Sequence, residues 1–192
     1  MSTKTELMTV YKQKKNRNQL EFSFKKNGLD YRLNDSNLNK KEFIPYERIT
    51  NNSHEFTERN DTYRNNAIYT AVVAVVFLAI NIFYGTRLWA WLFMLTSPTF
   101  WFLYKRSIVV FTVLPVSGYL DIYIIRDKLG RRIRNEIYTK RNKYLRSEYG
   151  YIDYDTPPEV ESDKFDWLHS LGVIGDTELE VVKEEIVKRA NA

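Results

Sequence analysis

Cysteine is absent from the 192 residues of this chain. Its absence excludes a disulfide framework, a thiolate metal site and a cysteine nucleophile, and it is compatible with a reducing cytoplasmic setting. A phosphate-binding glycine loop, an HExxH zinc motif and a nucleophile elbow are also missing. We therefore expect a protein that is not an enzyme, with no catalytic residue, no cofactor and no metal site.

Histidine is scarce, and the two histidines, His54 and His169, lie far apart without ligand spacing. Each is interpreted as an ordinary surface or core residue. Acidic residues of the segment 153–161 match no Ca²⁺ loop, and the adjacent prolines favour a solvated linker. The first thirty residues lack the apolar core of a secretory signal, so membrane insertion would depend on an internal segment.

Charge is missing from two long apolar runs. Residues 67–84 contain Asn81 as the one strongly polar side chain, and residues 88–104 contain no charged residue. With a rise of about 1.5 Å per residue, each helical run would approach the ~30 Å thickness of the apolar part of a bilayer. Because only 85–87 separate the runs, the sequence predicts a transmembrane hairpin over 67–104. The alternative is a buried helical hairpin within a soluble core.

Basic residues flank the predicted hairpin on one side. Arg64, Lys105 and Arg106 lie at its base, whereas Arg87 is the single charge in its turn. The positive-inside rule then predicts a multi-pass protein of the bacterial inner membrane with both termini in the cytoplasm. Aromatic residues agree with this topology, at the inner interface (Tyr69, Trp101, Tyr104) and at the outer one (Tyr84, Trp89, Trp91). Asn81 is interpreted as a polar contact between the helices; an ion or substrate site is the alternative.

Strand patterns occur before and after the hairpin. Residues 20–24 and 29–33 alternate apolar and polar side chains around a turn, which predicts a β-hairpin. A further strand is predicted around 43–49, and residues 51–66 are predicted to lead into the membrane as a helix continuous with the first span. After the hairpin, strands are predicted over 107–114 and 119–126, and a helix over 128–149 that ends at Gly150. The segments 1–66 and 105–150 would then form one split, β-rich cytoplasmic domain.

This order of elements, over residues 18–149, resembles bacterial pleckstrin-homology-like (PH-like) membrane proteins. The resemblance implies a curved antiparallel sheet that ends in an amphipathic helix and carries a membrane hairpin. The expected fold class is an α+β membrane protein, in which a small antiparallel PH-like domain is interrupted by a transmembrane helical hairpin and followed by a short helical pair. An unrelated α+β domain with the same order of elements is the alternative.

Charge is unevenly distributed: residues 1–149 contain 25 basic and 13 acidic residues, and residues 150–192 contain 4 basic and 11 acidic residues. The predicted helix over 128–149 is strongly basic and is a candidate for contacts with anionic lipids, at about 1 kcal/mol for each well-placed charge. A solvated basic face is the alternative, and no motif indicates a nucleic acid partner. The candidate lipid contacts are Arg131, Arg132, Arg134, Lys140, Arg141, Lys143 and Arg146.

The acidic end of the chain follows a predicted linker over 151–163. Two short helices are predicted over 164–192, around a turn at 172–175. The residues Leu171-Gly-Val-Ile-Gly-Asp-Thr-Glu-Leu, followed by Lys183 and Ile186, resemble the SHOCT module, although Gly175 replaces the usual Thr or Ser helix cap. The resemblance implies an element for interaction or oligomerisation. The candidate interaction seam comprises Leu168, Leu171, Ile174, Leu179, Val182 and Ile186, and it is expected to dock on the body, against the basic helix, or on another copy.

These features favour a non-enzymatic membrane protein that acts at the cytoplasmic face as an interaction or assembly module. Its expected partners are the bilayer itself and either a protein or an anionic lipid, with self-association through the C-terminal helices. Two alternatives remain at this stage. One is an immunity or defence protein that neutralises a membrane-active toxin, and the other is a lipid-modifying enzyme.

Overall fold

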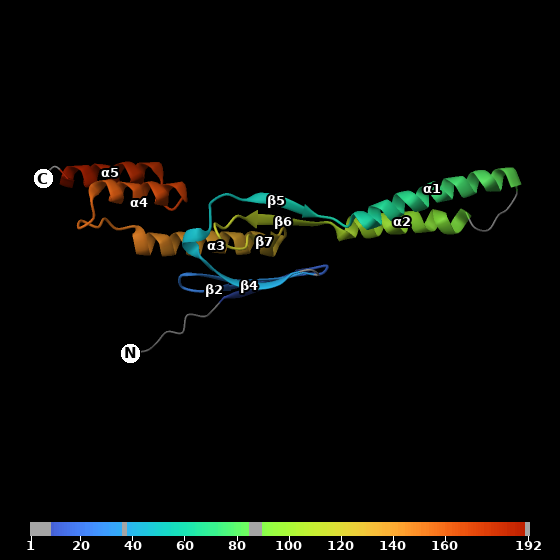
Figure 1. Cartoon of the computed structure of the whole chain (residues 1–192), viewed down its shortest axis with the longest axis horizontal. Coiled ribbons are helices and arrows are strands. Elements are labelled where there is room, and N and C mark those ends of the chain that lie inside the picture. The colour runs from blue at the N-terminus through green and yellow to red at the C-terminus, as the bar shows by residue number, and fades with distance from the viewer. Residues whose placement is uncertain (1–8, 36–37, 85–89, 191–192) are drawn as a thin grey trace. The chain divides into compact units, whose positions relative to one another are not determined.

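A computed structural model describes residues 9–35, 38–84 and 90–190 of the chain (Figure 1). The chain divides into two compact units, one formed by Met1–Glu55 with Thr112–Ala192 and the other by Phe56–Phe111. The fold is mixed α+β and contains two antiparallel sheets. The coarse fold class predicted from the sequence is therefore confirmed.

The larger sheet is an antiparallel meander of four strands, β1 (Val10–Lys15), β2 (Asn18–Phe24), β3 (Gly28–Asn34) and β4 (Asn39–Pro45). The predicted hairpin is β2–β3, whose register pairs Phe24 with Leu29. Apolar residues of β2 and β3 are buried on one face, as the alternation predicted. The strand predicted around 43–49 begins earlier, and Tyr46–Arg48 forms a 3₁₀ turn, η1, instead of continuing it.

Strand β1 was not predicted, because its inward residue is polar. Gln13 is 4% exposed. Its amide accepts a hydrogen bond from the Ile125 N–H at 3.0 Å and donates to the Ile125 carbonyl at 3.1 Å. The Gln13 amide thus forms the two hydrogen bonds that a neighbouring backbone peptide would form with Ile125, so the buried polar groups are satisfied. Because the inward side chain is polar, the sequence of β1 shows no alternation of apolar and polar residues.

The second sheet has the order β5 (His54–Glu58), β6 (Val109–Leu114) and β7 (Ile122–Ile125). Strands β6 and β7 were predicted, whereas β5 was not. The prediction of a helix over residues 51–66 holds for residues 61–66, which are helical and continuous with the first apolar run, and is wrong for residues 54–58, which form this strand. Every residue of β5 is exposed, so the strand carries no alternating apolar pattern.

Helix α3 (Lys128–Tyr149) has the predicted bounds. Asp127 caps its first turn by accepting a hydrogen bond from the Gly130 N–H, and Gly150 follows its last residue. The buried face of α3 contains Ile133 and Ile137. Buried side chains of β2, β3, β6 and β7 pack in the core of this unit as well.

The smaller unit contains helices α1 (Asp61–Tyr84) and α2 (Ala90–Ser107), which lie side by side (Figure 1). Asn60 caps α1 by accepting a hydrogen bond from the Thr62 N–H at 3.1 Å, so the helix begins before residue 67. Ala67 and Ala74 are buried, and the Ser97 hydroxyl donates to the Ala67 carbonyl at 3.0 Å. Small residues at such a contact let two helices approach closely.

Among the described residues, one helix is long and apolar enough to cross a membrane, over Asp61–Phe83. The described part of α2 is less apolar because it contains Thr96–Pro98 near its middle and Lys105 and Arg106 at its end. Of the two predicted transmembrane helices, the first, over 67–84, therefore meets the criteria of length and apolar composition, and the described part of the second does not. The predicted turn 85–87 and Trp89 lie outside the described residues, as do the side chains of Tyr84 and Trp91.

The tyrosines of the larger unit predict how its stability changes at alkaline pH. Burial raises the pKa values of Tyr31, Tyr46 and Tyr138, and burial together with the hydrogen bond to Glu47 raises the pKa of Tyr144 to about 12. The same tyrosines ionise near pH 10 in the unfolded chain. Because the folded state holds these protons more tightly, the contribution of these tyrosines to the free energy of unfolding should be fully present below pH 10 and be lost as the pH rises from about 10 to 12 and above.

Denaturant unfolding at several pH values, followed together with the ultraviolet absorbance of tyrosinate, checks this expectation. Tyr144→Phe should make the decline above pH 10 shallower. A stability that stays level up to pH 12, with every tyrosine ionising near its ordinary value, would contradict the assignment.

Candidate functional site

The basic residues of helix α3 differ in exposure, and the sequence alone does not show which are exposed and which are buried. Arg131, Arg132, Lys143 and Arg146 are exposed, whereas Arg134 and Lys140 are half-buried. Lys140 lies over the ring of Phe24, 4.8 Å from its centroid, and 3.5 Å from a carboxylate oxygen of Glu136. Its ammonium is thus already engaged within the fold.

Arg141 is a different case, because it is 1% exposed. Its Nη1 donates to the Ile49 carbonyl at 3.1 Å, and its Nη2 donates to the Leu171 carbonyl at 2.6 Å. The guanidinium also lies 4.9 Å from the centroid of the Tyr138 ring. Burial lowers the pKa of Arg141, and Tyr138 opposes that shift. The prediction that Arg141 contacts lipid does not fit this position, because the side chain joins three segments of the fold instead.

The acidic end of the chain docks on α3. Arg146 forms an ion pair with Glu178, and the Asn142 amide donates to the Gly172 carbonyl at 3.4 Å. Together with the Arg141 bond to Leu171, these contacts place the C-terminal helices against the basic helix. Docking of the acidic C-terminal helices on the basic helix within one chain is one of the two arrangements that the sequence predicted.

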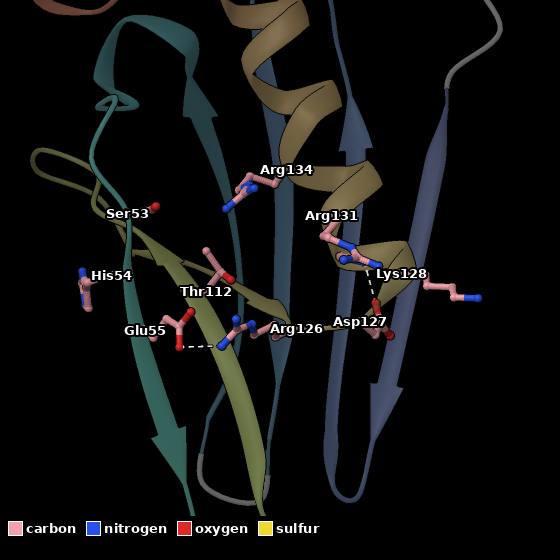
Figure 2. A pocket seen from close by; sticks show the side chains of 10 residues that line it. Ser53, His54, Glu55, Thr112, Arg126, Asp127, Lys128, Arg131 and Arg134 are labelled. Carbon is pink, nitrogen blue, oxygen red and sulfur yellow. Dashed lines mark hydrogen bonds and ion pairs between the residues drawn. The ribbon is translucent and has the colours of Figure 1, made fainter.

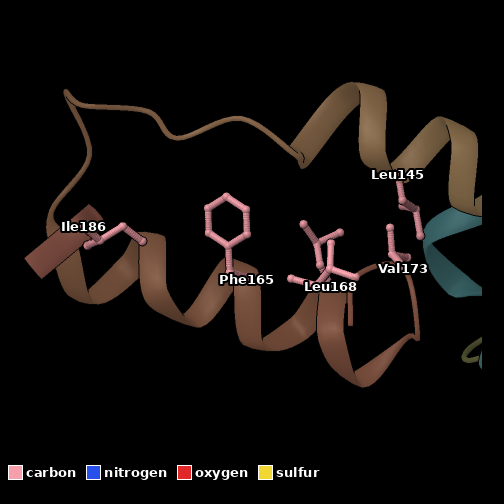
Figure 3. Packing of buried hydrophobic residues seen from close by; sticks show 6 residues of the cluster. Leu145, Phe165, Leu168, Val173 and Ile186 are labelled. Carbon is pink, nitrogen blue, oxygen red and sulfur yellow. The ribbon is translucent and has the colours of Figure 1, made fainter. Parts of the chain in front are cut away.

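The tail consists of α4 (Pro158–Ser170) and α5 (Asp176–Ala190). Helix α4 begins at Pro158, within the predicted linker, because proline is well suited to the first turn of a helix. Figure 3 shows buried residues of the seam around Leu145 of α3. Leu168, Ile174 and Ile186 are buried, and Leu171, Leu179 and Val182 pack against them. The predicted seam is therefore filled by contacts within one chain.

The turn between α4 and α5 explains the glycine in the SHOCT-like stretch. Gly172 has a φ of 68°, a left-handed conformation that favours glycine. Its N–H donates to the His169 carbonyl at 2.8 Å, and the Val173 N–H donates to the Leu168 carbonyl at 3.0 Å. These two bonds form a Schellman motif, which directs Val173 back onto Leu168 and closes the seam.

A pocket of about 580 Å³ lies beside the first turns of α3 (Figure 2). The strand side contributes Ser53 and Thr112, and α3 and the residues before it contribute Arg126, Lys128, Arg131 and Arg134. Two carboxylates also line the pocket. Glu55 binds Arg126 at 2.7 Å, and Asp127 caps Gly130 and accepts a hydrogen bond from Gln13 at 3.0 Å.

This pocket was missed by reasoning from the sequence. Arg131 and Arg134 were candidate lipid contacts, but Ser53, Thr112, Arg126 and Lys128 were not singled out. The four lie on three separate segments of the chain, so their association depends on the tertiary fold. The run of charge from Arg126 to Arg134 was the one available signal.

Of the other predicted positions, His54 is among the residues that line this pocket, and Asn81 and His169 are not. Asn81 is half-buried on α1, within the smaller unit. His169 lies 2.6 Å from Asp176, and His54 is exposed on β5. Within the part of the chain that the structure describes, no group of His, Cys, Asp and Glu residues is arranged to hold a metal ion.

Comparisons with protein families, curated proteins and solved structures found no match for the chain. The PH-like and SHOCT-like resemblances therefore rest on the residues and the order of elements given above.

Arg141 offers a direct test of how the tail is held. Arg141→Met keeps the length and much of the packing of the side chain but leaves the Ile49 and Leu171 carbonyls without their donors. Leaving such groups buried should lower the free energy of unfolding by about 2–4 kcal/mol and speed hydrogen exchange in α4 and α5.

The matched control is Lys143→Met, which removes one charge from an exposed position of the same helix. It should change stability by less than about 0.5 kcal/mol. Equal effects of the two substitutions, measured by denaturant unfolding and amide exchange, would show that Arg141 has no special role in holding the tail.

Proposed function

We propose that this chain is a non-enzymatic integral membrane protein whose α1–α2 hairpin crosses a bacterial inner membrane. Its α+β body would lie at the cytoplasmic face and act as an interaction module for anionic membrane surface, with the C-terminal helices as part of that body. The proposal is carried by one observation, the exposed apolar surface of the α1–α2 hairpin.

Helix α1 is apolar around most of its circumference, yet only 11% of the residues in its most apolar stretch are buried. Its exposed side chains include Val72, Val75 and Ile82, and those of α2 include Leu95 and Phe102. A helix in the core of a soluble protein would bury such residues, and a continuous exposed apolar surface indicates contact with lipid or a partner. Hydrocarbon chains satisfy this surface without a specific partner.

The residues at the base of the hairpin support the same view. Lys105 lies 5.5 Å from the ring centroid of Trp101, and that ring lies 5.6 Å from the ring of Tyr104. Arg59 and Arg64 flank Asp61 at the start of α1. Aromatic and basic residues gather in this way at the cytoplasmic boundary of membrane helices.

The body is tethered closely to the proposed span. Two residues separate β5 from α1, and one residue separates α2 from β6. Exposed basic residues of α3 are the proposed contacts with anionic headgroups, and each such charge is worth about 1 kcal/mol at a membrane surface.

The absence of cysteine allows a clean test of topology. Single cysteines at Asn52→Cys, Thr86→Cys and Ser170→Cys should leave the chain in membranes that have been washed at alkaline pH. We expect a membrane-impermeant maleimide to label Thr86→Cys on intact cells, and to label the other two variants only after the inner membrane is opened. Release of the chain by the wash, or labelling of Thr86→Cys only in opened cells, would rule out the proposed topology.

A further inference from the structure

The pocket beside α3 has an excess of positive charge that the fold does not use. Within the described residues, neither Arg131 nor Arg134 forms an ion pair. The two carboxylates of the lining are already committed, Glu55 to Arg126 and Asp127 to Gly130 and Gln13. Lys128, Arg131 and Arg134 therefore line the pocket without an ion pair to a carboxylate of the described residues.

The geometry around these cations suits an anion with several oxygen atoms. Figure 2 shows Arg134 reaching from α3 toward Thr112 and Ser53, with Arg126 on the same side of the helix. Guanidinium groups bind phosphate oxygens in pairs, and hydroxyl groups such as those of Ser53 and Thr112 donate further hydrogen bonds. The hydroxyl groups come from the residue before β5 and from β6, and the guanidinium of Arg134 comes from α3.

We propose that this pocket binds a phosphate monoester. A monoester carries close to two negative charges near neutral pH and offers three terminal oxygens, which match the unpaired cations better than the single charge of a diester does. The volume of about 580 Å³ exceeds what a bare phosphate needs and lies within the range of sites for small organic ligands. The remaining space would accept a small polar group that is attached to the phosphate.

Two sources present this chemistry, a monoester headgroup in the bilayer and a soluble organic phosphate. The lipid source depends on the proposed membrane function, whereas the soluble source does not. The inference can therefore fail while the chain still integrates into membranes, and the two outcomes are measured separately.

The test uses the full chain in phosphatidylcholine nanodiscs and phosphorus NMR. In one arm glycerol 3-phosphate is titrated against the protein, and in the other the nanodiscs contain a small fraction of phosphatidic acid or, for comparison, phosphatidylglycerol. A saturable shift of the monoester resonance is expected in at least one arm, and the arm in which it occurs identifies the source. Phosphatidylglycerol, a diester, should give a weaker effect.

Paired variants separate a pocket from diffuse attraction. Arg131→Gln with Arg134→Gln removes two charges from the lining, and Lys15→Gln with Lys41→Gln removes two charges from exposed strand positions outside it. The first pair should weaken binding at least tenfold, and the second less than threefold. Arg134→Lys, which keeps the charge but loses the planar fork, should also weaken binding, and it serves as a second variant if the first pair disturbs folding.

Two results would overturn the proposal. One is equal weakening by both pairs of substitutions, which would mean that net charge alone attracts the phosphate. The other is the absence of a saturable shift with glycerol 3-phosphate and with phosphatidic acid.

Discussion

A buried guanidinium holds the larger unit of this protein together. Arg141 lies on α3, yet its hydrogen bonds end on Ile49, after the first sheet, and on Leu171, in the turn of the tail. Among the residues that the structure describes, no carboxylate accepts a hydrogen bond from this guanidinium, so the cost of burying the charge is offset by backbone carbonyls, by the Asn142 side-chain oxygen and by the Tyr138 ring. The arrangement fixes where the tail docks, and the tail in turn covers Leu145 of α3.

The two halves of helix α3 contact different parts of the molecule. The C-terminal half carries Arg141 and Arg146, which bind the tail, while the N-terminal half carries Arg131 and Arg134, which line the pocket. The tail thus neutralises part of the basic helix and leaves the rest available. This division gives a physical reason for the opposite charges of the body and the tail.

Local signals in the sequence predicted several elements well. The helix over 128–149 was predicted correctly because the spacing of Ile133 and Ile137 marks its buried face and Gly150 marks its end. The β2–β3 hairpin likewise follows from alternating residues around a short turn. In these segments, local preference and tertiary packing agree.

Elements that depend on distant partners could not be predicted in this way. Gln13 can point inward because its amide pairs with Ile125, which lies far away in the sequence. Strand β5 has no buried residue and therefore no alternating pattern. The basic residues of α3 look alike in the sequence, and only the fold separates the buried Arg141 from the pocket-lining Arg134. The pocket combines segments around residues 53, 112 and 130, and no spacing rule connects them.

The central claim is that the exposed apolar surface of the hairpin faces lipid. Methyl groups of Val72, Val75 and Leu95 can be observed by NMR in nanodiscs that contain spin labels either on the acyl chains or in the water. We expect strong relaxation of these methyl groups by the acyl-chain label and little by the label in the water. The methyl groups of Leu168 in the tail should be affected by neither label. Strong relaxation by the aqueous label, or none by the acyl-chain label, would contradict the claim.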